Sequence, residues 1–302
     1  MRAVCAASVE GALPAVADHG ANLRTAPVDA HTADCGRADS QFSKNRQEQR
    51  QGWPMSVFVH QLRSEQLVFW RSREAAVFIF IFPIMLFVLL ASVFGGDYEG
   101  RPVKDFLLTG LLGYGAANTA FAGLAITLVL RRESGILKRL RSTPLSPSVY
   151  LAGVLASSLV VFALQAVVLV VLGRLVFDAE LPAQTAGVAL TLAFGALAMA
   201  ALGVGVAGLI RSAEGASAVV NVIVLPMSFL SGAFGPTRNL PRFLEALADA
   251  LPLRHFLDAV QGVYLDGHQP WDHAGSLAVV AAWGVVGLLL ALRYFSWQPR
   301  GR

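Results

Sequence analysis

The sequence predicts an all-α protein that crosses a membrane six times, and two observations support this fold class. Of the 302 residues, 55% are hydrophobic and 15% are charged, with a mean hydropathy of +0.57, whereas charged residues make up roughly 25% of soluble domains. The apolar residues gather in six blocks close to the ~20 residues that a bilayer-spanning helix needs. Because lipid offers the backbone no hydrogen-bond partners, we expect each block to be helical.

The limits of the six expected spans are set by runs of uncharged, largely aliphatic residues. The spans are expected at 77–94, 106–130, 151–172, 183–210, 216–234 and 274–292. Pro83 should kink the first span, and the small residues Gly115, Thr119 and Gly123 should let another helix approach the second. We expect no buried charged side chain in any span, which argues against transport driven by protons or sodium.

Amphipathic segments are expected on both sides of the membrane. Residues 1–54 contain few large apolar residues and are expected to form a disordered tail, with Met55 as an alternative translation start and the membrane domain at 55–302. An N-terminal helix at 56–74 fits the membrane interface, although a solvated lead-in remains an alternative. Two further amphipathic helices at 235–272, separated at Pro252, are expected to re-enter the outer interface between spans five and six.

The distribution of arginine and lysine predicts the orientation. The segments at the N-terminal side of span one, after spans two and four, and after span six hold about twice as many basic residues as the others. The positive-inside rule therefore places both termini in the cytoplasm. Because the basic residues flank the spans, the net charge of +4 is explained by orientation, and we expect no nucleic-acid partner.

Residues 131–150 form a basic island, RRESGILKRLRSTPLSPSVY, between spans two and three. Arg131, Arg132, Lys138, Arg139 and Arg141 stand against a single acid, Glu133. The spacing places Ile136, Leu137 and Leu140 on one helical face, which predicts a docking surface. The alternative is a loop that only sets orientation.

Candidate catalytic residues are scarce. None of the lysines, Lys44, Lys104 and Lys138, stands in a GxxxxGK[ST] phosphate loop, so this chain is not expected to hydrolyse ATP. The histidines and aspartates at 255–273 lack the HExxH spacing of a zinc protease, and Cys5 and Cys35 form no metal-binding pattern, so no metal site is expected. The energy for transport would have to come from a partner.

Three polar residues within the spans are candidates for a transport pathway. They are Gln165, Asn221 and Ser228. Interhelical hydrogen bonds are the commoner role of such residues, and a pathway lining is the alternative.

Two motifs carry a resemblance to a known family. The first is the run 132–153, including RESG, LKRL, STPL and YLAG, and the second comprises Leu240-Pro241, Leu251-Pro252-Leu253 and Asp258-Ala259-Val260. They resemble, in turn, the first cytoplasmic loop and the outer re-entrant helices of the ABC-2 type permeases, the membrane subunits of bacterial ABC exporters. The resemblance covers about 56–297 and departs from the family before Pro252 and near Gln261.

The resemblance implies a multi-pass permease of the inner membrane that exports a hydrophobic or amphipathic substrate, a drug or a lipid. It would act as a homodimer or heterodimer among membrane lipids, docked on an ABC ATPase that binds ATP and Mg²⁺, with no cofactor in this chain. The implied coupling residues are Arg132, Glu133, Gly135, Leu137, Lys138, Arg139, Leu140, Thr143 and Pro144. Pro144 would end the coupling helix. Export of lipid-linked polysaccharide and an ATP-independent scaffold are the alternatives.

Overall fold

A computed structural model gives the fold of residues 55–98, 100–140, 142, 145–235 and 241–298. The tail predicted at 1–54 lies outside the described residues, as do Arg141, Thr143 and Pro144. Everything below concerns the unit formed by Met55–Arg302.

Six helices are long and apolar enough to cross a membrane, which confirms the predicted fold class. They are α4 (Arg73–Val93), a continuous second span made of α5 (Val103–Ala116), η1 (Ala117–Gly123) and α6 (Leu124–Glu133), then α8 (Pro147–Phe177), α9 (Thr185–Leu209), α10 (Ala213–Leu230) and η2 (Pro270–His273) with α13 (Ala274–Tyr294). The shorter elements are α3 (Met55–Arg71), α7 (Ile136–Leu140), α11 (Arg242–Ala250), α12 (Pro252–Tyr264) and the paired strands β1 (Asp97–Tyr98) and β2 (Arg101–Pro102).

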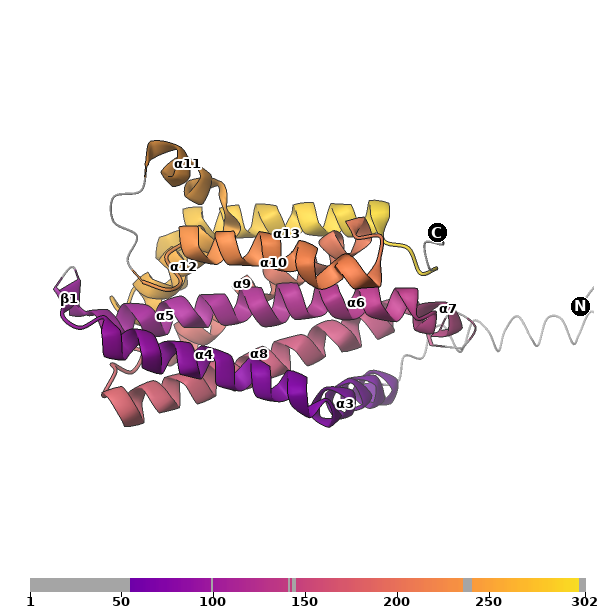
Figure 1. Cartoon of the computed structure of the whole chain (residues 1–302), viewed down its shortest axis with the longest axis horizontal. Coiled ribbons are helices and arrows are strands. Elements are labelled where there is room, and N and C mark those ends of the chain that lie inside the picture. Colours follow the sequence, from indigo (N-terminus) through magenta and orange to yellow (C-terminus); the bar gives the residue numbers. More distant parts are fainter. Residues whose placement is uncertain (1–54, 99, 141, 143–144, 236–240, 299–302) are drawn as a thin grey trace, which may run out of the picture. The chain divides into compact units, whose positions relative to one another are not determined.

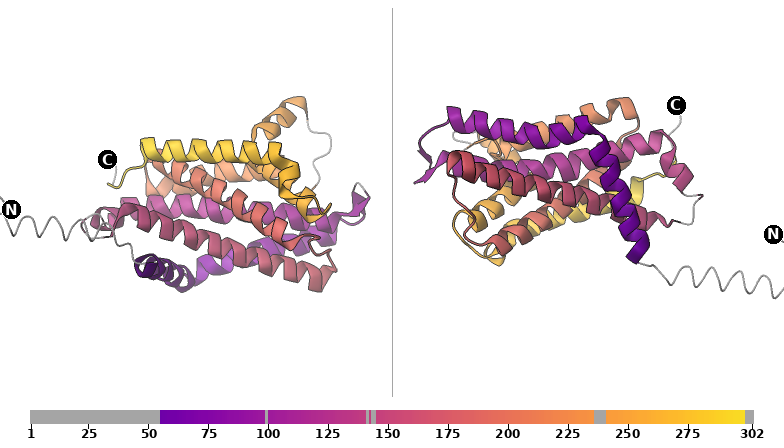
Figure 2. Two further views of the ribbon diagram at one scale, coloured as in Figure 1. Left: turned by 180° about the vertical axis from the view of Figure 1, so that it is seen from behind. Right: turned by 90° about the horizontal axis from the view of Figure 1, so that it is seen from below.

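The spans run side by side, and the short elements gather at the two ends of the bundle. Figure 1 shows α3 and α7 at one end, and β1, α11 and α12 at the other. In Figure 2, α3 runs across the bundle instead of along it. The basic island and the helices α11 and α12 thus lie at opposite ends of the bundle, as expected when an odd number of spans, three, separates them along the chain.

The second span is the most enclosed of the six. In its most apolar stretch 78% of residues are buried, against 17% for α4 and for the last span. Its middle, η1, is a π-helix, a wider turn that the sequence analysis did not predict. Such turns are rare and frequently occur at functional sites. Movement of this span would be transmitted to most of the bundle.

Small residues allow the backbones of α9 and α13 to approach closely. A Cβ atom built on Gly287 would lie 2.5 Å from the backbone nitrogen and Cα of Leu202, and one on Gly205 would lie 2.5 Å from the carbonyl oxygen of Gly287. Close backbone approach of this kind is how helices associate in lipid, where the hydrophobic effect does not drive them together.

We expect Gly287→Leu to lower the stability of the purified protein by about 1–3 kcal/mol, the usual cost of overpacking. The side chain would have to displace backbone atoms of α9 instead of a movable side chain. Gly275→Leu is the control, because a Cβ atom there meets nothing within 4 Å. The melting temperatures in detergent would be compared, and equal values for the two variants would contradict this account of the α9–α13 contact.

The structure corrects the expected limits of the spans around the basic island. The second span continues as helix to Glu133, and Pro147 is the first residue of α8. Pro147 therefore begins the next span, and only residues 134–146 connect the two. Hydropathy places the boundary at the first charges, whereas the helix continues because those side chains find partners inside the protein.

The expectation that no span contains a buried charge is wrong. Asp105, near one end of span two, is 1% exposed, and Arg132, near the other, is fully buried. One carboxylate oxygen of Asp105 accepts a hydrogen bond from the backbone N–H of Glu180 at 3.0 Å. Both charges lie near helix ends, where backbone groups lack helical partners and can bond to side chains.

The predicted break at Pro252 is confirmed, and the two helices beside it differ in burial. In α12, Phe256, Leu257 and Tyr264 are at most 1% exposed, whereas Phe243 of α11 is 71% exposed. Burial raises the pKa of Tyr264 to about 12, so its hydroxyl remains protonated and donates to the carbonyl of Glu180 at 2.9 Å. That α11 and α12 re-enter a membrane remains a prediction.

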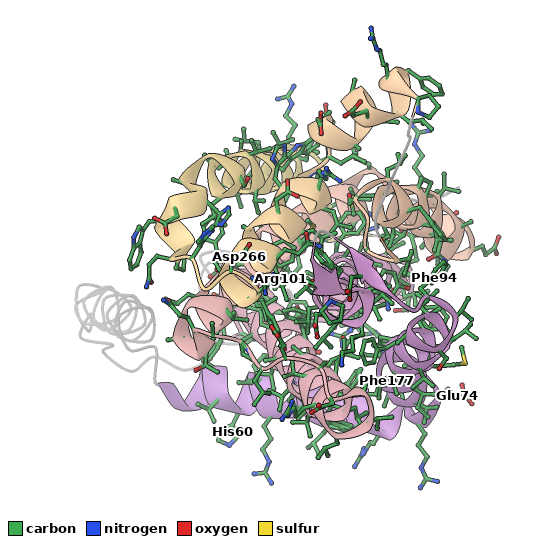
Figure 3. All side chains as sticks on the ribbon, turned by 90° about the vertical axis from the view of Figure 1, so that its left-hand side faces the viewer. His60, Glu74, Phe94, Arg101, Phe177 and Asp266 are labelled. Carbon is green, nitrogen blue, oxygen red and sulfur yellow. The ribbon has the colours of Figure 1, made fainter. Side chains whose placement is uncertain are left out.

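Ion pairs and hydrogen bonds hold the connecting segments together at the end of the bundle where α12 lies. Arg101, in β2, donates a hydrogen bond to Asp266 at 2.9 Å, and Figure 3 shows the two side chains close together. Lys104 donates to the carbonyl oxygens of Phe177 and Asp178. The first residues of span two are therefore held to the end of α8.

Candidate coupling site

The C-terminal end of span two is joined to two other helices by Arg131. Its guanidinium donates to both carboxylate oxygens of Glu65 in α3, at 2.9 and 2.6 Å, and to the hydroxyl of Tyr150 in α8 at 2.8 Å. Gln61 donates to the same carboxylate at 2.8 Å. The side chains of Arg131 and Glu65 are 17% and 8% exposed. A two-point pair of this kind fixes both position and orientation.

Arg132 joins the same end of the span to α9. Its guanidinium donates to the carbonyl oxygens of Ala207 at 3.0 Å and Ile210 at 2.6 Å, and its Nε donates to Glu133 at 2.8 Å. The two carbonyls belong to the C-terminal turn of α9, where carbonyls lack helical partners and a cation is favourable. Arg132 is fully buried, so it positions the island and is not available to contact a partner.

Gly135 forms the turn between α6 and α7. Its φ of +74° lies in the left-handed region, which glycine adopts without the steric cost that a side chain brings. Its carbonyl accepts the N–H of Arg139 at 3.1 Å, which closes the first turn of α7. Gly135 thus sets the direction in which α7 leaves span two.

The faces of α7 differ from the sequence expectation. Leu137 is fully buried and Leu140 packs against the core, whereas Ile136 is 46% exposed. The three apolar residues therefore do not form one docking face. Leu137 anchors α7 to the bundle, and the exposed face carries Ile136, Lys138 and Arg139.

The remaining residues of the proposed coupling set are placed as follows. Glu133 is half-buried and paired with Arg132, while Thr143 and Pro144 lie outside the described residues. Glu65 was missed by the sequence analysis, because its partner Arg131 lies 66 positions away and nothing in the local pattern links them.

This arrangement can transmit a force. The exposed face of α7 is attached through one glycine turn to a rigid, enclosed span, and the join is fastened to α3, α8 and α9 by charged hydrogen bonds. A push on α7 would therefore move several helices together instead of bending a loose connection.

The three pathway candidates occupy different environments. Gln165 is buried and accepts a hydrogen bond from Thr119 at 2.8 Å, and Ser228 is buried and donates to the carbonyl of Val224 in its own helix at 2.8 Å. Asn221 is exposed on α10 and has no hydrogen-bond partner among the described residues. Of the three, Asn221 alone presents its amide outside the bundle.

The histidines and aspartates of residues 255–273 do not converge as metal ligands would. His268 and His273 approach to 3.3 Å between ring nitrogens. Within the described ranges, however, no group of three His, Cys, Asp or Glu side chains could hold a metal ion.

Comparison with known proteins identifies the family. Residues 57–265 match the model of the ABC-2 type transporter family, which is well over half of the chain, so the chain belongs to that family. It is a membrane transport permease with several spans and not itself a catalytic subunit. Members of the family generally work with an ABC ATPase.

The relatives agree with this assignment. The chain is 23% identical over 239 residues to "Putative transport permease YvfS" of Bacillus subtilis (strain 168), covering 78% of this chain and 96% of that protein. It is 26% identical over 161 residues to "Probable multidrug ABC transporter permease YbhR" of Escherichia coli (strain K12), covering 52% of this chain and 44% of YbhR. It is also 26% identical over 145 residues to "Inner membrane transport permease YhhJ" of the same strain, covering 46% and 38%. The chain spans less than half the length of YbhR and YhhJ.

Proposed function

We propose that this permease is the membrane subunit of an ATP-driven exporter, and that α7 receives the movement of a separate ATPase. The observation that carries the proposal is the exposed face of α7 with Ile136, Lys138 and Arg139, fixed to the most enclosed span of the bundle. Two exposed cations and an apolar side chain suit an acidic cleft with an apolar floor. ATP and Mg²⁺ would bind to the partner.

The proposed orientation places α3, α7 and the end of α13 in the cytoplasm. These elements lie at one end of the bundle (Figure 1), and this end carries most of the basic residues that flank the spans. The α3 helix would lie along the inner membrane surface, with its half-exposed Trp70 at headgroup depth.

The proposed transport pathway lies along α10, between two copies of the permease. An amide exposed to hydrocarbon is costly, so polar side chains on a span normally face a protein neighbour or a water-filled path. Asn221 lies on an exposed face with Val222, 73% exposed, and Leu225, 44% exposed. This mixed surface suits an amphipathic drug or lipid. The word "multidrug" in the name of YbhR agrees with a drug substrate.

Cysteine cross-linking tests the pairing of two copies along α10. In a background with Cys5 and Cys35 changed to serine, Asn221→Cys is expected to give a disulfide-linked dimer in membranes. Val285→Cys is the control, because Val285 is 55% exposed on α13, which we place at the lipid. Dimers from position 285 and none from position 221 would contradict the proposed interface.

Transport by inside-out vesicles tests the function itself. Vesicles containing the permease and its co-purified ATPase should accumulate a fluorescent amphipathic dye only when ATP and Mg²⁺ are supplied. Accumulation of a lipid-linked oligosaccharide and no dye would replace the proposed substrate class. Uptake that needs no ATP, or a permease that never co-purifies with an ATPase, would contradict the exporter function.

A further inference from the structure

A cavity of about 470 Å³ lies between α3, α4, span two and α8, on the side of span two next to α3. This volume falls within the range of about 300–1,000 Å³ found for sites that bind small ligands. Its lining is mostly apolar, and includes Phe69 and Val68 of α3, Ile79 of α4, Leu124 and Ile126 of span two, and Val161 of α8. The cavity is separate from α7 and from Asn221, which do not line it.

Part of the cavity lining is polar. Glu65 and Arg131 belong to it, but they are engaged with each other. Ser72, the residue between α3 and α4, also lines the cavity. Its neighbours in sequence, Arg71 and Arg73, are exposed, and neither has an ion-pair partner among the described residues. Two exposed arginines thus flank the residue at the junction of α3 and α4, with the exposed acid Glu74 next to Arg73.

We propose that the cavity holds one acyl chain of an anionic phospholipid, with the phosphate between Arg71 and Arg73. The apolar walls would take the chain, and the two arginines would select a negative headgroup. Phe69 and Glu65 both belong to α3, and Glu65 pairs with Arg131 of span two. The bound lipid would therefore lie beside the ion pair that joins α3 to span two. The placement of the phosphate at the membrane surface rests on the proposed interfacial position of α3, whereas the site does not depend on which substrate is exported.

Lipid titration of the purified full chain tests the headgroup. In a non-ionic detergent, intact-mass spectrometry would count phosphatidylglycerol or phosphatidylcholine retained at each lipid concentration. We expect phosphatidylglycerol to bind more tightly, by about fivefold for each arginine, and the double change Arg71→Gln and Arg73→Gln to remove the preference. Arg63→Gln, an exposed arginine earlier in α3, is the matched control and should keep it.

Filling the cavity tests where the acyl chain lies. A Cβ atom on Gly123 would meet only the carbonyl oxygen of Asn118, at 3.5 Å, so Gly123→Leu should fold and project into the cavity. Ser158→Leu enters from α8, and Gly275→Leu is the control on an open surface. Each cavity variant should weaken phosphatidylglycerol binding at least tenfold, and the control should not. Equal affinity for the two lipids, an equal loss with Arg63→Gln, or unchanged binding in folded cavity variants would overturn the proposal.

Discussion

Replacing Glu65 by leucine is expected to destabilise the permease by about 3–5 kcal/mol, the cost of removing one partner from a buried ion pair. The guanidinium of Arg131, whose side chain is 17% exposed in the native protein, would lose both carboxylate oxygens. Arg131→Leu is expected to be similarly harmful, because Glu65 would then keep only the amide of Gln61. Equilibrium unfolding in mixed micelles would give the free energies.

The double variant distinguishes a specific pair from two independent contributions. When Glu65 and Arg131 are both leucine, no uncompensated charge remains buried, so the loss should be well below the sum of the single losses. Arg63→Leu, on the exposed surface of the same helix, should change stability by no more than about 0.5 kcal/mol. Additive losses at 65 and 131 would contradict the proposed join between α3 and span two.

Reversing the charges on α7 is expected to abolish transport without unfolding the permease. The change Lys138→Glu with Arg139→Glu places two acids on the exposed face of α7, where like-charge contact with an acidic partner costs several kcal/mol. Co-purification of the ATPase should fall at least about tenfold, together with ATP-dependent dye uptake in vesicles.

The control for α7 must reverse a positive charge at the same end of the bundle without touching the proposed contact. Arg293→Glu is such a control, because Arg293 is an exposed base in the last turn of α13 at that end. Changing Leu137 would be uninformative, since this side chain is fully buried and its loss would disturb the fold. Normal transport by the Lys138 and Arg139 variant would remove α7 from the proposed mechanism.

Much of the fold follows from the sequence, because an apolar block in a bilayer has few alternatives to a helix. The six spans were predicted on this basis. The division between α11 and α12 was predicted from two amphipathic faces separated by Pro252. The π-helix of span two was not, because hydropathy carries no information on how the turns of a helix are wound. Window hydropathy also misplaced the ends of span two, since it cannot register the distant carbonyls that bond Arg132.

The candidate site was only partly predictable. The basic island was found from its composition. Which face of α7 is buried was not predicted, because a helix of five residues can turn either side to the bundle. Leu137 and Ile136 are chemically alike, and the direction in which α7 leaves the Gly135 turn is not written in their side chains. The pairing of Glu65 with Arg131 arises from tertiary packing, and a single sequence holds no local signal for it.

Cross-linking from Arg139 tests most directly whether α7 receives the movement of an ATPase. A photoreactive amino acid placed at position 139 in the full chain, in cells, should form an adduct whose partner is identified by mass spectrometry. The account predicts an ABC ATPase as the major partner, and no such adduct from position 293. Adducts with lipid alone, or with a protein that has no ATP-binding site, would contradict it.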